Sequence, residues 1–138
     1  MKKIRVGVIG LGFIGKQHVE ALRRLPYIEI VAGSDSNLSM REWCEKNGIQ
    51  KYYSDYKEML TNENMDVVHN CTPNNFHYEV SCEILKTGCH VYSEKPLTIK
   101  SVEGESLIEL ADKKGLKTAV NFNYRNNSVS YTHLTLPT

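Results

Sequence analysis

The sequence lacks the features that mark membrane proteins and nucleic-acid-binding proteins. No apolar run in its 138 residues approaches the ~20 residues that cross a bilayer. The formal net charge is only +1, and Lys and Arg are scattered, so no basic face is available for nucleic acid or for an anionic membrane surface. We therefore expect neither nucleic acid nor a membrane among the partners. The length suits one domain with its own core.

Cysteine is also scarce, and its spacing excludes the usual cysteine-based sites. The four cysteines are Cys44, Cys71, Cys82 and Cys89. None forms a C-x-x-C pair or stands at zinc-site spacing from a histidine, so we expect no metal. Scattered thiols in a chain of this size fit a reducing compartment better than a disulfide framework.

The N-terminus has only a superficial likeness to a secretion signal. Met1 and two lysines precede the apolar run at 6–15, but four of those ten residues are glycine. No small-residue cleavage site follows. We expect this segment to belong to the folded protein and the protein to be cytoplasmic.

Short β-branched runs alternate with amphipathic segments along the chain. Strands are expected at 4–9, 28–32, 51–53, 67–71, 90–93 and 117–121, and helices at 14–25, 39–46, 55–60, 76–86 and 101–114. Parallel strands need crossover helices, and these crossovers are right-handed. The pattern predicts an α/β fold: a Rossmann-type, doubly wound parallel sheet of six strands with helices on both faces.

Local signals indicate the buried faces and ends of these helices. The first helix should bury a stripe of residues at helical spacing: Ile14, His18, Ala21, Leu22 and Leu25. The last helix should bury Leu107, Ile108 and Ala111, and Gly115 should supply its left-handed cap. Ser54 is the expected N-cap of the short helix at 55–60.

The last residues do not continue the pattern. We expect a domain over 1–125 and a tail over 126–138, of which 129–138 has neither helical nor strand period and is not native sequence. A natural disordered tail is the alternative.

A glycine-rich loop carries the clearest functional signal. Gly10, Gly12 and Gly15 form G-x-G-x-x-G directly after an expected strand and before an expected helix. The first glycine permits a tight turn, the second lets a pyrophosphate approach the backbone, and the third lets helix and strand pack closely. With Phe13 and Ile14 they form the expected cofactor-binding loop, whose helix N-terminus attracts phosphate.

Asp35 indicates which dinucleotide binds. It lies twenty residues beyond Gly15, at the end of the second expected strand, where a carboxylate accepts hydrogen bonds from the adenosine ribose. Its charge would repel a 2′-phosphate, and neither Ser34 nor Ser36 offers a cation for one. We expect NAD rather than NADP. A glycine turn that binds nothing is the alternative.

Three further segments follow later strands, at the edge where doubly wound sheets bind ligands. They are T-P-N-N-F-H at 72–77, E-K-P at 94–96 and N-Y-R at 123–125. Together with G-L-G-F-I-G-K-Q-H at 10–18, they resemble the glucose–fructose oxidoreductase/inositol dehydrogenase (Gfo/Idh/MocA) family. The four motifs come in the family's order and cover nearly all of residues 1–125.

The resemblance implies roles for the matched residues. Lys95 would be the catalytic lysine, hydrogen-bonding the reacting oxygen beside the nicotinamide, and the Lys95–Pro96 bond would be cis. The other matched positions would lie at the cofactor: Thr72, Pro73, Asn74, His77, Glu94, Pro96 and Arg125.

Several of these residues also have purely structural interpretations. Glu94 and Lys95 could form an exposed ion pair of little value. His77 could serve only in hydrogen bonding at the start of a helix, and Arg125 could join domains. His18 is expected to be a core histidine rather than a ligand, and His69 and His90 to be structural.

Family members continue into a second domain with the acid/base histidine, most substrate contacts and the oligomer interface. The resemblance therefore implies an NAD(P)-dependent oxidoreductase for a secondary alcohol of a sugar or cyclitol, forming a homo-oligomer through that domain. The fragment alone should bind cofactor without turnover. An NAD-sensing Rossmann module without catalysis is the alternative, and Lys95 argues against it.

Overall fold

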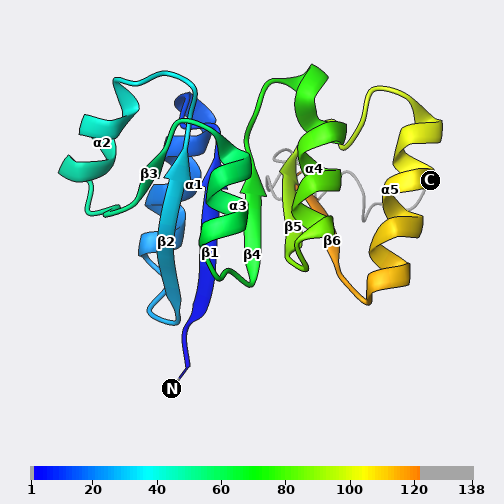
Figure 1. The fold of residues 1–138 in the computed structure, drawn as a ribbon, viewed down its shortest axis with the longest axis horizontal. Helices are drawn as coiled ribbons and strands as arrows, with labels where there is room; N and C mark the ends of the chain where they lie inside the picture. Colours follow the sequence, from blue (N-terminus) through cyan, green and yellow to red (C-terminus); the bar gives the residue numbers. More distant parts are fainter. Residues whose placement is uncertain (1, 122–138) are drawn as a thin grey trace, which may run out of the picture.

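A computed structural model describes residues 2–121 as one parallel sheet with flanking helices (Figure 1). The elements, in order, are β1 (Ile4–Ile9), α1 (Phe13–Arg23), β2 (Ile28–Ser34), α2 (Met40–Lys46), β3 (Tyr52–Tyr53), α3 (Tyr56–Asn62), β4 (Val67–Asn70), the 3-10 turn η1 (Asn74–Phe76), α4 (His77–Lys86), β5 (His90–Glu94), α5 (Ser101–Lys114) and β6 (Thr118–Asn121). The expected Rossmann-type fold is confirmed. The expected tail and the N-Y-R segment lie outside the described residues.

The sheet has the strand order β3-β2-β1-β4-β5-β6, and every pair is parallel. The order reverses beside β1, because β2 lies on one side of it and β4 on the other. Ile9 pairs with Ser34 and Asn70, and Asn70 pairs with Ser93, so the carboxyl ends of four strands align. Ligands of doubly wound sheets bind above such an edge, at the point of reversal.

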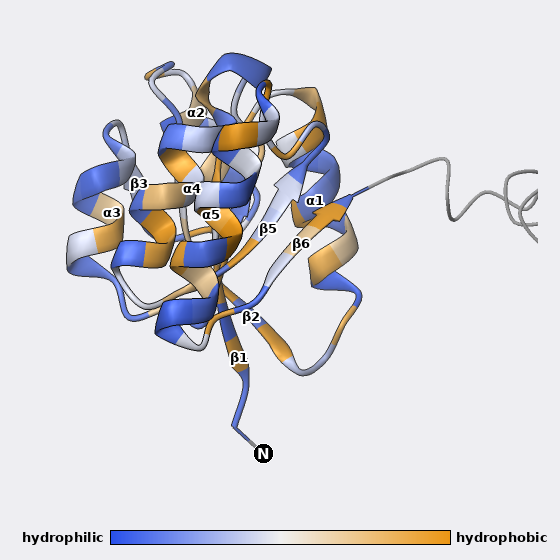
Figure 2. Ribbon diagram, turned by 90° about the vertical axis from the view of Figure 1, so that its right-hand side faces the viewer, coloured by the Kyte–Doolittle hydropathy of each residue, from blue (hydrophilic) through white to orange (hydrophobic). Residues whose placement is uncertain are grey.

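Two apolar cores cover the two faces of the sheet. The larger lies against α3, α4 and α5, and the smaller lies against α1 and α2. Figure 2 views the sheet from its β6 side, with α3, α4 and α5 on one side and α1 on the other. The smaller core involves β1, β2 and β3 with only Val67 of β4 at its margin, so it does not extend over β5 and β6.

Two details of the helices differ from expectation, and one agrees with it. The N-cap of α3 is Asp55 rather than Ser54, because the Asp55 side chain accepts a hydrogen bond from the Lys57 backbone N–H at 2.9 Å. Ile108 is 49% exposed, because α5 buries only the stripe of Leu107 and Ala111. Gly115 ends α5 with φ of 66°, as expected.

The buried face of α1 is rotated from the expected stripe. Gly15, His18, Val19 and Leu22 are buried. Ile14, Ala21 and Leu25 are instead exposed. Their side chains line a hollow over the part of the sheet that the smaller core leaves uncovered.

Candidate functional site

The glycine loop makes a tight turn against the end of β4. Gly10 has φ of 90°, and a Cβ on it would meet the backbone of Cys71. A Cβ on Gly15 would overlap the carbonyl oxygen of Gly10. Both positions therefore exclude larger residues, because the chain packs against itself there.

Gly12 differs, because a Cβ there would meet nothing within 4 Å. It is the N-cap of α1, and it makes no side-chain cap hydrogen bond. The first N–H groups of α1 thus face open space, with the positive end of the helix dipole behind them. This cradle suits the pyrophosphate of a dinucleotide. Phe13, the next residue, is 76% exposed.

Asp35 lies at the end of β2 and also holds the loops around it. Its Oδ2 accepts the Leu11 N–H at 2.7 Å, and its Oδ1 accepts the Asn37 N–H at 2.7 Å. A carboxylate has about four lone-pair positions, so acceptor capacity remains for ribose hydroxyls. The residue is half-buried beside the glycine loop, where an adenosine ribose would reach it.

A cation near Asp35 was missed by the sequence reasoning, which considered only the adjacent serines. The Arg41 guanidinium lies 5.3 Å from the centre of the Tyr52 ring, and the Tyr52 hydroxyl donates to the Asp35 carbonyl at 2.6 Å. Arg41 lies six positions after Asp35 in the sequence, at the start of α2. A basic residue at the start of the second helix is the signal that would have found it.

The segment after β4 is held by a buried amide. Asn70 donates to the His77 carbonyl at 3.0 Å and to the Ser81 hydroxyl at 2.9 Å, and its Oδ1 accepts from the Thr72 hydroxyl at 2.7 Å. This fixes the turn that carries Thr72, Pro73 and Asn74. Thr72 and Asn74 line the same hollow as Ile14.

His77 is buried at 1% exposure and links this turn to the E-K-P segment. One ring nitrogen contacts the Pro96 carbonyl at 2.5 Å, and the other contacts the Thr72 carbonyl at 2.7 Å. Both ring nitrogens are therefore engaged by the backbone of two loops. The expected contact of His77 with the cofactor stays a prediction.

Glu94 ends β5 with its carboxylate turned toward α1. Its Oε1 accepts His18 Nε2 at 2.6 Å and the Asn121 amide at 2.8 Å. Burial alone would raise the pKa of Glu94, but the hydrogen bonds from Asn121, His18 and the Lys95 backbone lower it below its ordinary value. Glu94 is thus an anion with fixed orientation, and within residues 2–121 it forms no ion pair with Lys95.

Lys95 follows on the exposed rim, and the Lys95–Pro96 bond is cis, as expected. In the described part of the chain, the Lys95 ammonium makes no hydrogen bond or ion pair with another side chain. Its three donors therefore remain available to a ligand.

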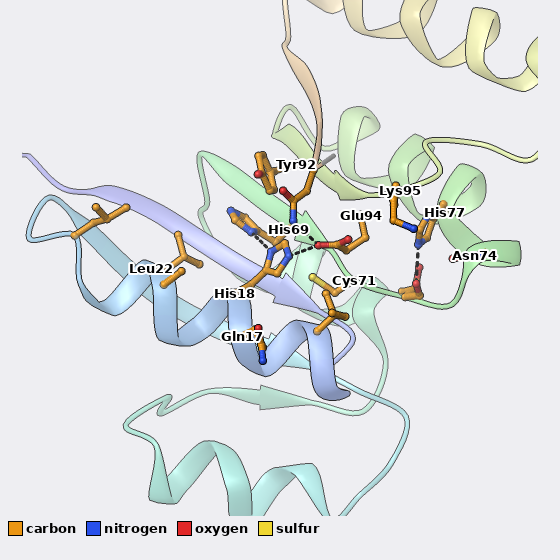
Figure 3. A pocket seen from close by; sticks show the side chains of 15 residues that line it. Gln17, His18, Leu22, His69, Cys71, Asn74, His77, Tyr92, Glu94 and Lys95 are labelled. Atoms are coloured by element: carbon orange, nitrogen blue, oxygen red, sulfur yellow. Dashed lines mark hydrogen bonds and ion pairs between the residues drawn. The ribbon is translucent and has the colours of Figure 1, made fainter. Parts of the chain in front are cut away.

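Six of the expected residues line one hollow of about 770 Å³ (Figure 3). Of the predicted site residues, it is lined by Ile14, Thr72, Asn74, His77, Glu94 and Lys95. Figure 3 shows Lys95 beside His77 on one side of Glu94, and His18 on the other. Asp35 does not line this hollow, and Arg125 lies outside the described residues.

The polar floor of the hollow was not foreseen as a unit. His18 contacts His69 at 2.8 Å through their Nδ1 atoms, and Tyr92 packs against both rings. Burial and the neighbouring His18 lower the pKa of His69 to about 3. The available signal was the polar side chains at alternate positions of β4 and β5, which an apolar core would not contain.

Within residues 2–121, no three His, Cys, Asp or Glu side chains come together as a metal site, and no helix is long and apolar enough to cross a membrane. All four cysteines are free.

Comparison with known proteins agrees with this geometry. Residues 4–122 match the family model GFO_IDH_MocA, described as an oxidoreductase family with an NAD-binding Rossmann fold. The chain is 36% identical over 123 residues to myo-inositol 2-dehydrogenase of Thermotoga maritima, covering 88% of this chain and 37% of that protein. It is 36% identical over 124 residues to D-glucoside 3-dehydrogenase of Escherichia coli, covering 88% and 35%.

Solved structures show the same relationship. Scyllo-inositol dehydrogenase from Lactobacillus casei with bound NAD(H) and scyllo-inositol superposes with a TM-score of 0.88 at 25% identity, covering 96% of this chain and 40% of that one. Myo-inositol 2-dehydrogenase from Lactobacillus plantarum gives a TM-score of 0.87 at 27% identity, covering 95% and 40%. The chain thus spans somewhat more than a third of the length of its relatives. It belongs to the Gfo/Idh/MocA family of oxidoreductases, and residues 4–122 match that family's NAD-binding Rossmann domain.

Proposed function

We propose that the protein containing this chain oxidises a secondary alcohol of a sugar or cyclitol with NAD, or performs the reverse reduction. The observation that carries the proposal is the Lys95 ammonium, which has no side-chain partner among the described residues and lines the same hollow as Ile14 of the glycine loop. The names of two relatives, an inositol dehydrogenase and a glucoside dehydrogenase, support this substrate class.

The residues present fit the cofactor. Gly12 and the uncapped start of α1 would receive the pyrophosphate, with Phe13 and Ile14 beside it. Asp35 would accept the adenosine ribose hydroxyls and disfavour NADP. Thr72, Pro73 and Asn74 would border the nicotinamide half from one side, and Glu94 and Pro96 from the other. When bound, NAD supplies the hydride acceptor.

Lys95 would act on the substrate oxygen. Its ammonium donates a hydrogen bond to the hydroxyl or carbonyl oxygen and stabilises the negative charge that develops there as the hydride leaves or arrives. A sensor domain has no need of a free ammonium at this position.

The remaining parts of the activity belong to the rest of the protein. We propose that residues outside this chain supply the substrate wall, the acid/base histidine and a homo-oligomer interface, and that Arg125 approaches the substrate. We also propose a cytoplasmic location, consistent with four free cysteines.

The test compares cofactor binding with turnover. The 138-residue chain should quench or enhance NADH fluorescence on binding, yet show no turnover of myo-inositol, glucose or methyl glucoside. In the longer protein, Lys95→Ala should remove most activity, since loss of general acid–base help typically costs about 10²–10⁴-fold. NADH affinity should stay nearly unchanged. Robust turnover by the 138-residue chain would contradict the proposal that this chain binds the cofactor and that catalysis needs residues outside it.

A further inference from the structure

The face of the sheet toward α1 changes from apolar to polar beside β1. Over β1 and β2 it is apolar, but the side chains that β4, β5 and β6 present to the hollow are polar: His69, Tyr92, Glu94 and Asn121. His18 projects from α1 into this group and connects it (Figure 3). A buried polar group costs free energy unless it is fully hydrogen-bonded, so each proton position matters.

The contacts determine where the protons lie. Glu94 Oε1 also receives the Asn121 amide, so it acts as an acceptor, and His18 must carry a proton on Nε2. The two Nδ1 atoms are 2.8 Å apart, a distance that requires one proton between them. When both rings are neutral, His18 therefore has Nε2–H with a bare Nδ1, and His69 has Nδ1–H with a bare Nε2.

The pair can take up one further proton but not two. An external proton binds His69 Nε2, and the Nδ1 proton of His69 passes to Nδ1 of His18. The positive charge then lies on His18, 2.6 Å from the Glu94 carboxylate. Two charged rings would place two protons between the Nδ1 atoms, which their separation excludes.

The neighbouring groups agree with this proton count. Burial raises the pKa of Tyr92 and of Cys71, and the charge of Glu94 adds to both effects, so these groups stay neutral. Burial and the neighbouring His18 lower the pKa of His69, so positive charge on the His69 ring itself is disfavoured. Among the described side chains that line the hollow, Glu94 is thus the anion, and Lys95 is the only lysine or arginine.

We propose that His18 and His69 form a pair that shares one proton between their Nδ1 atoms and positions the Glu94 carboxylate as an anion at the edge of the hollow. His18 is a positioning residue: it follows the glycine loop directly and ties α1 to the E-K-P segment. This goes beyond the expected role of His18 as an ordinary core histidine.

One consequence for cofactor binding rests on the proposed function. With NAD bound in the hollow, a carboxylate anion beside the nicotinamide favours the positively charged ring of NAD⁺ over the neutral ring of NADH. Protonation of the pair brings a positive charge next to Glu94 and weakens this preference. The affinity ratio of NAD⁺ to NADH should therefore fall on acidification.

The proton positions can be measured without cofactor. The 138-residue chain, labelled with ¹⁵N-histidine, reports by NMR which ring nitrogens carry a proton. We expect a proton on exactly one of the two Nδ1 atoms of His18 and His69 at every pH where the chain is folded. His90 is an internal reference: its Nδ1 accepts the Lys117 N–H at 3.0 Å, so neutral His90 should show Nε2–H. Bare Nδ1 atoms on both His18 and His69, or protons on both, would overturn the pair.

The effect on the cofactor is tested with matched variants. Glu94→Gln removes the charge, and His18→Leu removes the hydrogen bond that orients it. Each should lower the NAD⁺-to-NADH affinity ratio by roughly threefold or more, in line with a partly exposed ion pair. His18→Gln keeps an N–H donor and should recover most of the ratio. Glu105→Gln, an exposed carboxylate on α5, is the charge-matched control.

The outcomes separate this proposal from the proposed function. An unchanged ratio in Glu94→Gln would overturn the positioning role even if both cofactors bind well. Failure of the parent chain to bind either cofactor would count against the proposed function, and the NMR result would then decide the histidine pair alone.

Discussion

Asp35 shows at the scale of one residue how a binding group can also be structural. Its carboxylate caps the backbone of Leu11 and Asn37, and its remaining lone pairs are available to a ribose. A substitution to alanine would therefore change loop geometry and cofactor preference together.

Asp35→Asn separates these effects, because the amide keeps an acceptor oxygen but loses the charge. We expect the preference for NADH over NADPH to shrink by about tenfold, equivalent to ~1.4 kcal/mol. Fluorescence titration with both cofactors measures it. NADPH binding as tight as NADH in the parent chain would show that Asp35 does not select the cofactor. Arg41→Gln, in the same region, tests whether the nearby cation already helps to bind a 2′-phosphate in the parent chain.

The glycines offer a matched pair of substitutions. Gly12→Val places a side chain in open space, so the thermal midpoint should hold while NADH binding falls at least about tenfold, a loss of ~1.4 kcal/mol. Gly10→Ala instead meets the Cys71 backbone at φ of 90° and should lose roughly 1–2 kcal/mol or more of stability. Full NADH affinity in Gly12→Val would place the cofactor elsewhere.

At the scale of elements, helix ends depend on single side chains. The start of α3 has Ser54 and Asp55 side by side, and only the latter caps the helix in the structure. Asp55→Ala should lower the free energy of unfolding by about 1 kcal/mol, and Ser54→Ala should change it little. Urea denaturation of both variants measures the difference, and equal losses would contradict the assignment.

The free energy of unfolding should depend on pH through His69, which lies on β4. Burial lowers its pKa to about 3 from an unfolded value near 6.5, so the unfolded chain binds a proton that the folded ring resists. Its contribution to stability is complete above the unfolded pKa and is lost progressively as the pH falls toward 3. Glu94, with a lowered pKa, loses its contribution only as the pH falls below its ordinary carboxylate range.

His69→Asn tests the histidine term. Asparagine keeps an N–H donor near the position of Nδ1 and does not titrate. Between pH 6.5 and 4.5, the slope of unfolding free energy against pH should flatten by up to one proton, or about 1.4 kcal/mol per pH unit at most. An unchanged slope, measured by urea denaturation in that window, would show that His69 does not couple folding to pH.

At the scale of the whole molecule, the buried members of both core clusters of the described chain lie between Val6 and Ala111. The final ten residues, 129–138, lie outside the described residues, and their sequence has neither helical nor strand period. Deleting them should shift the thermal midpoint by no more than about 2 °C, well below the 4–8 °C that 1 kcal/mol typically moves in a small domain. A larger fall, measured by circular dichroism, would mean that this segment packs as native sequence.

Much of this fold can be predicted from the order of residues along the chain. Each β-branched run and each helical stripe predicts an element, and alternation of the two permits only a parallel sheet with crossovers. The motif G-x-G-x-x-G after the first strand and Asp35 after the second are likewise recognised by their spacing along the sequence. Such signals can be found without a structure because neighbours in sequence remain neighbours in the fold.

Other features depended on contacts between distant residues, and only the tertiary structure decided them. The exposure of Ile14, Ala21 and Leu25 follows from how α1 is rotated against the sheet, which helical spacing alone does not specify. His18, His69 and Glu94 are separated by up to 76 residues and meet because the His18 side chain reaches from α1 to β4 and β5. The sequence by itself determined which elements form and that they bind a dinucleotide. Packing decided which polar side chains share protons, because hydrogen bonds depend on ångström-scale placement that no local pattern encodes.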